Sequence, residues 1–205
     1  MIRLSVTALE SYRYFKNAED GDLDRLLADL AHVSPPTRKM AAGRALAKFF
    51  EHARDGAQDA AVVDGWRFDF NLDAAVALPA LRELKVEEVF QTSSGPVTLV
   101  GKLDGIEGID VHDQKLTDSL DVEGNYIDSL QWRAYLAMLG AKRFVYDIFV
   151  GRVSEREEVV TVSGYHRLVF YSYPNIRADV ERAVGELAEV VTTYQPQIAA
   201  LKGAA

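Results

Sequence analysis

The chain has 205 residues, 48% of them hydrophobic, which is enough to bury a core of its own, and we expect a single domain over residues 1–205. The absence of cysteine excludes disulfide frameworks, thiolate zinc sites and iron–sulfur clusters. The formal net charge of −8 argues against a protein that coats nucleic acid by electrostatics alone, although a basic groove can coexist with an acidic whole. No apolar run approaches the roughly 20 residues of a membrane span, so we expect no membrane contact and a cytoplasmic location.

Apolar residues recur at helical spacing throughout the N-terminal part, residues 5–56. Ser5 and Thr37 stand where they can cap helices, and the prolines at 35 and 36 stop one, because proline cannot continue the hydrogen-bond ladder. The last of these helices is expected to end near Gly56. We therefore predict three helices, at residues 5–18, 22–32 and 37–54.

The third of these helices carries candidate functional side chains. Gly43, Ala47 and Glu51 share one face, because four residues separate each from the next. Two small residues allow this face to approach a sheet, and Glu51 then reaches the sheet's polar edge. Arg44 and Lys48 share a face close to Glu51, which makes them candidates for contacts with a phosphate backbone. A solvated helix surface is the alternative for all three charged residues.

After residue 60 the sequence changes to strand patterns. Residues 62–70 indicate a strand or an irregular cover, and residues 71–82 support no assignment. Three alternating segments joined by short turns predict a meander of consecutive antiparallel strands, at residues 85–91, 97–104 and 109–116. The central part, residues 60–150, is completed by a helix at residues 126–139, with Ile127 facing inward, and a strand at residues 144–150.

The C-terminal part, residues 155–201, contains two short apolar segments and one long apolar stripe at helical spacing. We predict edge strands at residues 159–162 and 167–171, and a long final helix that begins at Pro174. Together with the preceding segments, these elements predict an α/β (α+β) fold in which a central mixed sheet is flanked by helices.

Two carboxylates and a lysine fall on two neighbouring strands of the predicted meander. Asp113 and Lys115 are two residues apart, so their side chains emerge on the same face, and Asp104 lies near the end of the preceding strand. Asp104 and Asp113 can therefore bind one hard cation, Mg²⁺ or Mn²⁺, with the backbone carbonyl of Gln114 and waters completing its shell. Glu51 would add a carboxylate for this metal or for a second one.

A metal with a neighbouring lysine is the combination that phosphodiester hydrolysis needs. The ion polarises the phosphoryl oxygen and lowers the pKa of a bound water, while Lys115 orients that water or offsets the charge of the transition state. The alternative is that Asp113 and Lys115 form a surface ion pair. Apolar neighbours at Ile109, Val111 and Leu116 favour the site, because unpaired buried charge is costly.

Three motifs follow one another along the chain: Gly-x-x-Asp at residues 101–104, Asp-x-Lys at residues 113–115 and Gln-x-x-x-Tyr at residues 131–135. On strand, strand and helix in this order, they resemble the PD-(D/E)XK nuclease superfamily, specifically its RecB-like and phage-exonuclease branches. The resemblance covers residues 5–150 and implies a restriction-endonuclease-like core.

The resemblance also implies roles for the motif residues. Asp104 and Asp113 would be the metal ligands, Lys115 the catalytic lysine, and Gln131 with Tyr135 would support the site or contact the DNA backbone. Without the resemblance, these last two residues are equally well explained as a polar residue and a core aromatic on one helix face.

The chain departs from the family pattern in one place. Many RecB-like members carry a histidine four residues after a glycine on the helix before the sheet, and here Ala47 follows Gly43 at that spacing. The acidic residue four positions further on is present as Glu51. This indicates the exonuclease-like variant, in which a helix glutamate serves the site.

The resemblance implies a Mg²⁺- or Mn²⁺-dependent deoxyribonuclease of phage-type recombination, DNA repair or DNA processing. Because nothing in the sequence resembles a module that reads sequence, such as a helix-turn-helix or a zinc finger, we expect an exonuclease rather than a sequence-specific endonuclease. DNA would be its substrate, a recombination or single-strand-annealing protein its partner, and a phage-encoded copy would work in the host cytoplasm. One alternative is a catalytically inactive member of the fold that acts as a DNA-binding or assembly subunit. Another is an α+β protein that binds a small ligand. The sequence does not indicate the oligomeric state.

Overall fold

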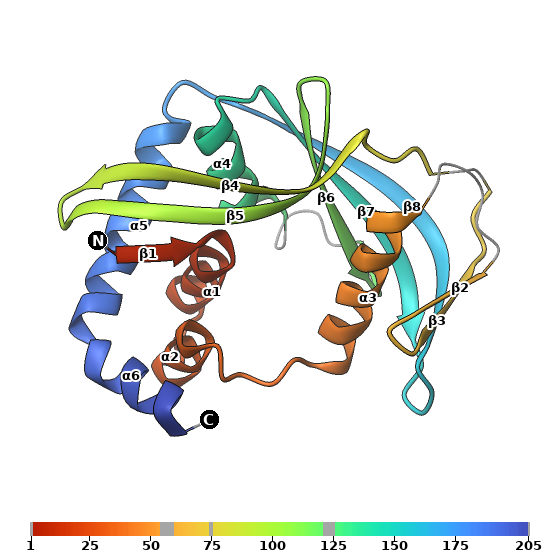
Figure 1. Ribbon diagram of the computed structural model, residues 1–205, viewed down its shortest axis with the longest axis horizontal. Helices are drawn as coiled ribbons and strands as arrows, with labels where there is room; N and C mark the ends of the chain where they lie inside the picture. Colours follow the sequence, from red (N-terminus) through yellow and green to blue (C-terminus); the bar gives the residue numbers. More distant parts are fainter. Residues whose placement is uncertain (1, 54–59, 74–75, 121–125, 205) are drawn as a thin grey trace.

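The structure is a computed structural model that describes residues 2–53, 60–73, 76–120 and 126–204. An eight-stranded mixed sheet runs through it, with strands in the order β1-β5-β6-β7-β8-β3-β2 and with β4 also paired to β5. Helices pack against this sheet (Figure 1). The predicted fold class, a central mixed sheet flanked by helices, is therefore confirmed.

The strands are β1 (Ile2–Ser5), β2 (Ala60–Val63), β3 (Trp66–Phe70), β4 (Leu81–Thr92), β5 (Gly95–Glu107), β6 (Asp110–Thr117), β7 (Arg143–Val153) and β8 (Val159–Tyr171). The helices are α1 (Val6–Asn17), α2 (Leu23–Ala31), α3 (Arg38–His52), α4 (Leu130–Leu139), α5 (Ile176–Thr193) and α6 (Gln195–Ala204).

The first three helices begin where the sequence predicts. The side chains of Ser5, Asp22 and Thr37 each accept a hydrogen bond from a backbone N–H in the first turn, which satisfies a donor that the helix leaves free. Helix α3 ends at His52, and the predicted end near Gly56 lies outside the described residues. No helix in the described part of the chain is long and apolar enough to cross a membrane.

The predicted meander is confirmed. β4 and β5 pair antiparallel along almost their whole length, and the turn between Thr92 and Gly95 closes this hairpin. β6 then pairs antiparallel with the end of β5 and parallel with β7. The four residues of β1, which pair parallel with β5, were not predicted because so short a segment has little pattern of its own.

The prediction of two edge strands in the C-terminal part is wrong. β8 is one continuous strand that lies inside the sheet, antiparallel to β7 and parallel to β3. Ser163 and Gly164 interrupt its apolar pattern, but the structure absorbs them as a register shift opposite Val150 and Gly151 of β7. Asp147 of β7 is buried and accepts hydrogen bonds from the side chains of Tyr165 and Arg167 on β8, at 2.5 and 2.8 Å.

Two predicted helices have different limits in the structure. Helix α4 begins after Ser129, whose hydroxyl accepts a hydrogen bond from Gln131, and Ile127 is 45% exposed rather than inward. The long final helix starts at Ile176 and is interrupted at Tyr194, so it forms α5 and α6.

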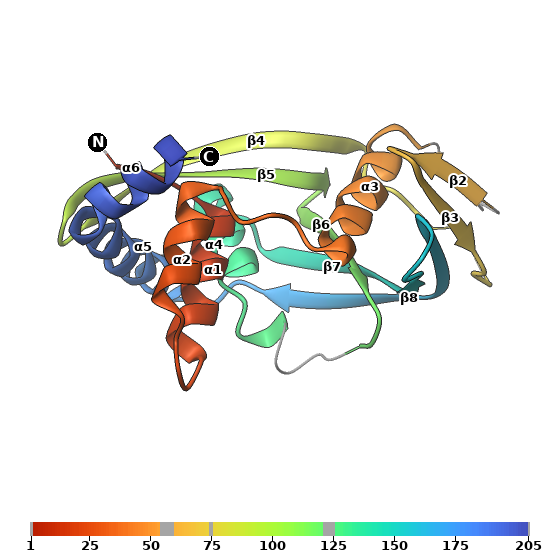
Figure 2. The same cartoon turned by 90° about the horizontal axis from the view of Figure 1, so that it is seen from below.

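The helices pack on two separate apolar cores. The larger core joins α1, α2, α4, α5 and α6 to β1, β4, β5 and part of β7, whereas the smaller core packs α3 against β3, β7 and β8. Figure 2 shows α3 apart from the other helices, toward the opposite end of the sheet. The strands β5 and β6 therefore run between two helical groups.

Candidate active site

The sheet opens between β5 and β6. β4 covers one edge of β5 along almost its whole length, so β1 and β6 must share the other edge. β1 pairs with residues 97–100 and β6 with residues 105–107, which leaves residues 101–104 paired with neither strand. The candidate site lies at this opening, where α1 begins directly after β1.

The side chain of Asp104 bonds to β6 where the backbones of β5 and β6 are not paired. Its Oδ2 atom accepts a hydrogen bond from the backbone N–H of Gln114 on β6, with 2.6 Å between N and O. The carboxylate thus satisfies a donor that the separation of the strands would otherwise leave free. The group of Gln114 that contacts Asp104 is its N–H, while the proposed role of its carbonyl as a metal ligand stays a prediction.

Asp113 and Lys115 lie side by side on β6, as their spacing predicts. Asp113 is 3% exposed, and its Oδ2 atom lies 2.5 Å from the ammonium nitrogen of Lys115. Its Oδ1 atom accepts a hydrogen bond from the side-chain amide of Gln131 on α4, at 2.5 Å. Asp113, Lys115 and Gln131 are therefore in direct contact, and Asp104 is joined to Asp113 through the backbone of its neighbour Gln114.

The electrostatics of this group favour a cation. Burial raises the pKa of Asp104, and the nearby charge of Asp113 raises it further. Burial also raises the pKa of Asp113, against the opposing effect of Lys115 and Gln131. Burial alone would lower the pKa of Lys115, but the two carboxylates outweigh it and raise that pKa. One lysine thus faces two carboxylates in a poorly solvated place, which leaves negative charge uncompensated.

Gly101 and Tyr135 are packing partners. A Cβ atom on Gly101 would lie 2.4 Å from a ring carbon of Tyr135, so only glycine leaves room for the ring. The Tyr135 hydroxyl donates a hydrogen bond to the carbonyl of Lys102, at 2.8 Å. These contacts fix α4 against the unpaired segment of β5, and Gln131, one turn away, is thereby held over Asp113.

A cleft of about 940 Å³ opens over these residues, between the start of α1, α3 and the strands β4, β5 and β6. Its walls carry an excess of positive charge, although the chain as a whole is acidic. The basic residues are Arg3, Lys39, Arg44, Lys85, Lys102 and Lys115, and the acidic ones are Glu87, Asp104 and Asp113. A local basic groove is the arrangement that a phosphate backbone requires.

The residues predicted on α3 divide into two groups. Arg44 lines the cleft and makes no ion pair with any residue that the structure describes. Lys48 instead pairs with Asp64, at 2.6 Å, and Glu51 lies beside His52; neither is among the described residues that line the cleft. Ala47, which stands where the family resemblance expects histidine, does line it.

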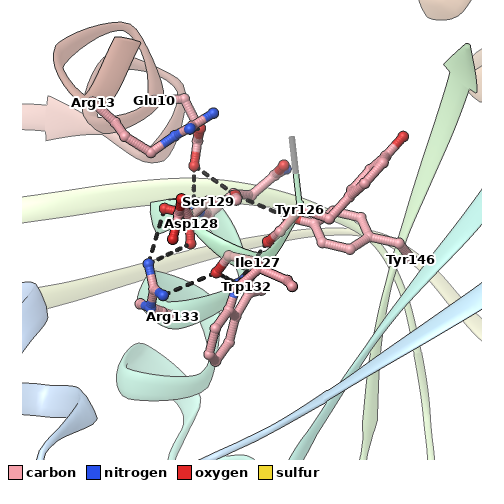
Figure 3. Close-up of polar contacts among 10 residues, drawn as sticks. Glu10, Arg13, Tyr126, Ile127, Asp128, Ser129, Trp132, Arg133 and Tyr146 are labelled. Carbon is pink, nitrogen blue, oxygen red and sulfur yellow. Dashed lines mark hydrogen bonds and ion pairs between the residues drawn. The ribbon is translucent and has the colours of Figure 1, made fainter. Parts of the chain in front are cut away.

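A different glutamate, Glu10 on α1, approaches the site. Its Oε1 atom accepts hydrogen bonds from the Ser129 hydroxyl and from the backbone N–H of Gln131, both at 2.6 Å, and its Oε2 atom accepts one from Arg13 at 2.9 Å. Figure 3 shows Glu10 extending from α1 to the start of α4. Its negative charge acts on both Asp113 and Lys115. Sequence reasoning missed Glu10, and its position on the first aromatic helix gave no signal of this contact.

The residues present fit a divalent cation of the Mg²⁺ type. The Oδ2 atom of buried Asp113 has no hydrogen-bond partner among the described residues, although Lys115 lies near it as an ion pair. No group of three or more histidine, cysteine or acidic side chains gathers in the described part of the chain. Mg²⁺ commonly uses one or two carboxylates and keeps several waters, so Asp104 and Asp113 suffice as side-chain ligands.

Comparison with known proteins places this geometry in a known fold. No family model matches the sequence, and a search of curated proteins also finds no match. The crystal structure of SSO0001 matches over 93% of this chain and 77% of its own, with 15% identity and a TM-score of 0.55. The chain therefore shares its fold, a central mixed sheet flanked by helices, with that structure. An alkaline exonuclease from Laribacter hongkongensis also matches, over 98% of this chain and 91% of its own, with 11% identity and a TM-score of 0.46.

Proposed function

We propose that this protein is a metal-dependent DNA nuclease, and more an exonuclease than a sequence-specific endonuclease. The observation that carries the proposal is the meeting of Asp104, Asp113, Lys115 and Gln131 at the opening of the sheet, beneath a basic cleft. A nuclease fold agrees with this chemistry but does not by itself establish it. A role in recombination or repair beside a strand-annealing protein stays a prediction from the sequence.

Each residue of the group has a separate part in the proposed reaction. Asp104 and Asp113 would hold Mg²⁺ or Mn²⁺, which would polarise the phosphoryl oxygen and lower the pKa of a bound water. Lys115 keeps its positive charge because its carboxylate neighbours raise its pKa, and its side chain is 36% exposed at the cleft. It can therefore offset negative charge that develops on the phosphate. Gln131 fixes the orientation of Asp113.

The test is a cleavage assay on labelled linear and circular DNA, with Mg²⁺ and separately with Mn²⁺. We expect degradation of linear DNA, and a loss of at least about 100-fold in Lys115→Ala, because one preorganised charge at a transition state contributes on this scale. Lys142→Ala is the matched control, since Lys142 is exposed and lines neither the cleft nor its surroundings. Equal rates in wild type and Lys115→Ala, or no degradation with either ion, would refute the proposal.

A catalytically inactive DNA-binding or assembly subunit is the second candidate. The acidic net charge of −8 and the alanine at position 47, where the family resemblance expects histidine, favour it. Calorimetric titration with Mg²⁺ separates the two candidates. The nuclease predicts binding heat that disappears in Asp113→Asn, whereas the inactive subunit predicts no heat that depends on Asp113.

A further inference from the structure

A second cavity, of about 370 Å³, adjoins the cleft at Lys115. Both spaces are lined by Thr7, Lys39, Lys115, Leu116 and Gln131, so the cavity directly adjoins the cleft at these residues. A volume of this size is in the range of sites for small organic groups. No step of the proposed hydrolysis uses it.

Tyrosines from separate parts of the chain line this cavity. Tyr126 and Tyr146 form its inner wall, with ring centroids 5.0 Å apart in an edge-on arrangement, and both are buried. The ammonium nitrogen of Lys115 lies 5.7 Å from the centre of the Tyr146 ring. The aromatic wall therefore borders directly on the group proposed to act on the phosphate.

The third tyrosine, Tyr14 on α1, lines the cavity and is 56% exposed. It is nevertheless held in place, because the guanidinium carbon of Arg13 lies 4.1 Å from its ring centroid. Arg13 is itself 7% exposed and is fixed by its hydrogen bond to Glu10. An ordered aromatic ring that stays open to solvent is a surface on which another flat group can stack.

We propose that this cavity binds a nucleobase of the substrate strand, next to the phosphate at Lys115, with the base stacked on Tyr14. This rests on the proposed nuclease function and adds the substrate class. A base inside a duplex is paired and stacked on its neighbours, so the cavity selects a single strand or an unpaired end. The preferred substrate is therefore single-stranded DNA.

The charge of the molecule supports this assignment. A net charge of −8 limits what phosphate contacts can contribute, whereas stacking on an aromatic ring does not depend on net charge. Several basic residues of the cleft are also partly neutralised, since Arg3 pairs with Glu87, Lys39 with Asp118 and Lys102 with Glu83. A stacked base supplies affinity where these ion pairs reduce the electrostatic part.

The experiment measures binding without cleavage, by fluorescence anisotropy in Ca²⁺ and again in EDTA. The probes are a labelled single-stranded 12-mer, the same 12-mer with an abasic site at one end or the other, and a blunt duplex. We expect the intact single strand to bind most tightly, and Tyr14→Ala to weaken it about tenfold, the effect of losing one base stack. Tyr14→Phe should stay within about twofold of wild type, because its ring can still stack.

Tyr171→Ala is the matched control, because Tyr171 is 63% exposed and lies on β8, outside the residues that line the cleft and the cavity. The proposal is overturned if Tyr14→Ala binds the single strand as wild type does, if Tyr171→Ala weakens binding equally, or if the duplex binds as tightly as the single strand. If the protein cleaves DNA but Tyr14→Ala binds the single strand as wild type does, only the base-binding site is refuted. If Tyr14→Ala weakens binding but wild type cleaves no DNA, only the nuclease function is refuted.

Discussion

Glu10 occupies an unusual place among the residues of the site, because it contacts neither the cleft nor the proposed metal directly. Its two oxygens accept hydrogen bonds from Ser129, from the backbone of Gln131 and from Arg13. Gln131 in turn donates to Asp113. Glu10 is therefore a positioning residue, which holds the start of α4 so that the amide of Gln131 meets the carboxylate of Asp113.

Replacing Glu10 by glutamine tests this role. In Glu10→Gln, an amide NH₂ would replace one carboxylate oxygen and could not accept the hydrogen bonds from Ser129, Gln131 or Arg13 that the oxygen accepts. The start of α4 should then shift, and Gln131 should no longer fix the orientation of Asp113. We expect activity to fall about 10- to 100-fold and the Mg²⁺ concentration for half-maximal activity to rise, as when a supporting contact of a metal ligand is lost. Both are measured by titrating Mg²⁺ in the cleavage assay.

Glu19→Gln removes the same charge from an exposed position shortly after the end of α1 and serves as the control. If Glu10 has a purely structural role, Glu10→Gln should lower the free energy of unfolding in urea but leave the Mg²⁺ dependence of the proposed activity unchanged in the folded protein. An unchanged Mg²⁺ requirement in Glu10→Gln would therefore contradict the positioning role.

At the residue scale, the sequence was informative where the contacts are local. Asp113 and Lys115 are two apart on one strand, and Asp104 is joined to them by a short hairpin, so spacing alone brought them together. Glu10 reaches Gln131 across more than one hundred residues of chain. No periodicity of α1 reveals that Glu10 reaches α4. Glu51 on α3 is not among the described residues that line the cleft, and its role as a metal ligand stays a prediction.

At the scale of elements, the packing of α4 on β5 depends on the absence of a side chain at position 101. Gly101→Ala would place a methyl group 2.4 Å from the Tyr135 ring, so ring or strand must move. We expect the free energy of unfolding to fall by about 1–3 kcal/mol, the usual cost of overpacking a core. Urea denaturation measures it. Gly203→Ala is the control, since its Cβ would meet nothing within 4 Å.

Introducing Gly101→Ala into a Tyr135→Ala variant shows whether the clash with the Tyr135 ring causes this loss of stability. If the clash with the ring is responsible, Gly101→Ala should cost much less there, and the two changes should be strongly non-additive. Additive costs would mean that position 101 requires glycine for another reason.

Elements with a strong pattern of their own were predicted well, and those defined by distant partners were not. The capped amphipathic helices α1, α2 and α3 and the hairpin of β4 and β5 follow from local sequence. By contrast, β1 is a four-residue strand that pairs with β5, and β8 accommodates Ser163 as an extra residue at a register shift opposite Val150 and Gly151 of β7. Such pairings join residues far apart in the sequence, which local propensity does not report.

On the scale of the whole molecule, charge is distributed unevenly. The chain carries 31 acidic and 23 basic residues, yet the cleft has six basic and three acidic side chains. Composition alone predicted only the acidic average. The concentration of lysine and arginine around the opening of the sheet arises from four separate segments, β1, α3, β4 and the β5–β6 pair, which only the fold brings together.

Comparing Arg44 with Lys48 tests whether the cleft binds the phosphate backbone. The two residues lie one turn apart on α3, and the sequence predicts both equally as phosphate contacts. Arg44 lines the cleft without an ion pair among the described residues, whereas Lys48 is paired with Asp64 outside it. Each phosphate contact contributes about 0.7 to the slope of log binding constant against log salt concentration for single strands. We expect Arg44→Ala to reduce that slope by about this amount and Lys48→Ala to leave it unchanged.

Binding of a labelled oligonucleotide over a range of NaCl concentrations measures both slopes. Equal reductions in the two variants would mean that the phosphate backbone also contacts the outer face of α3.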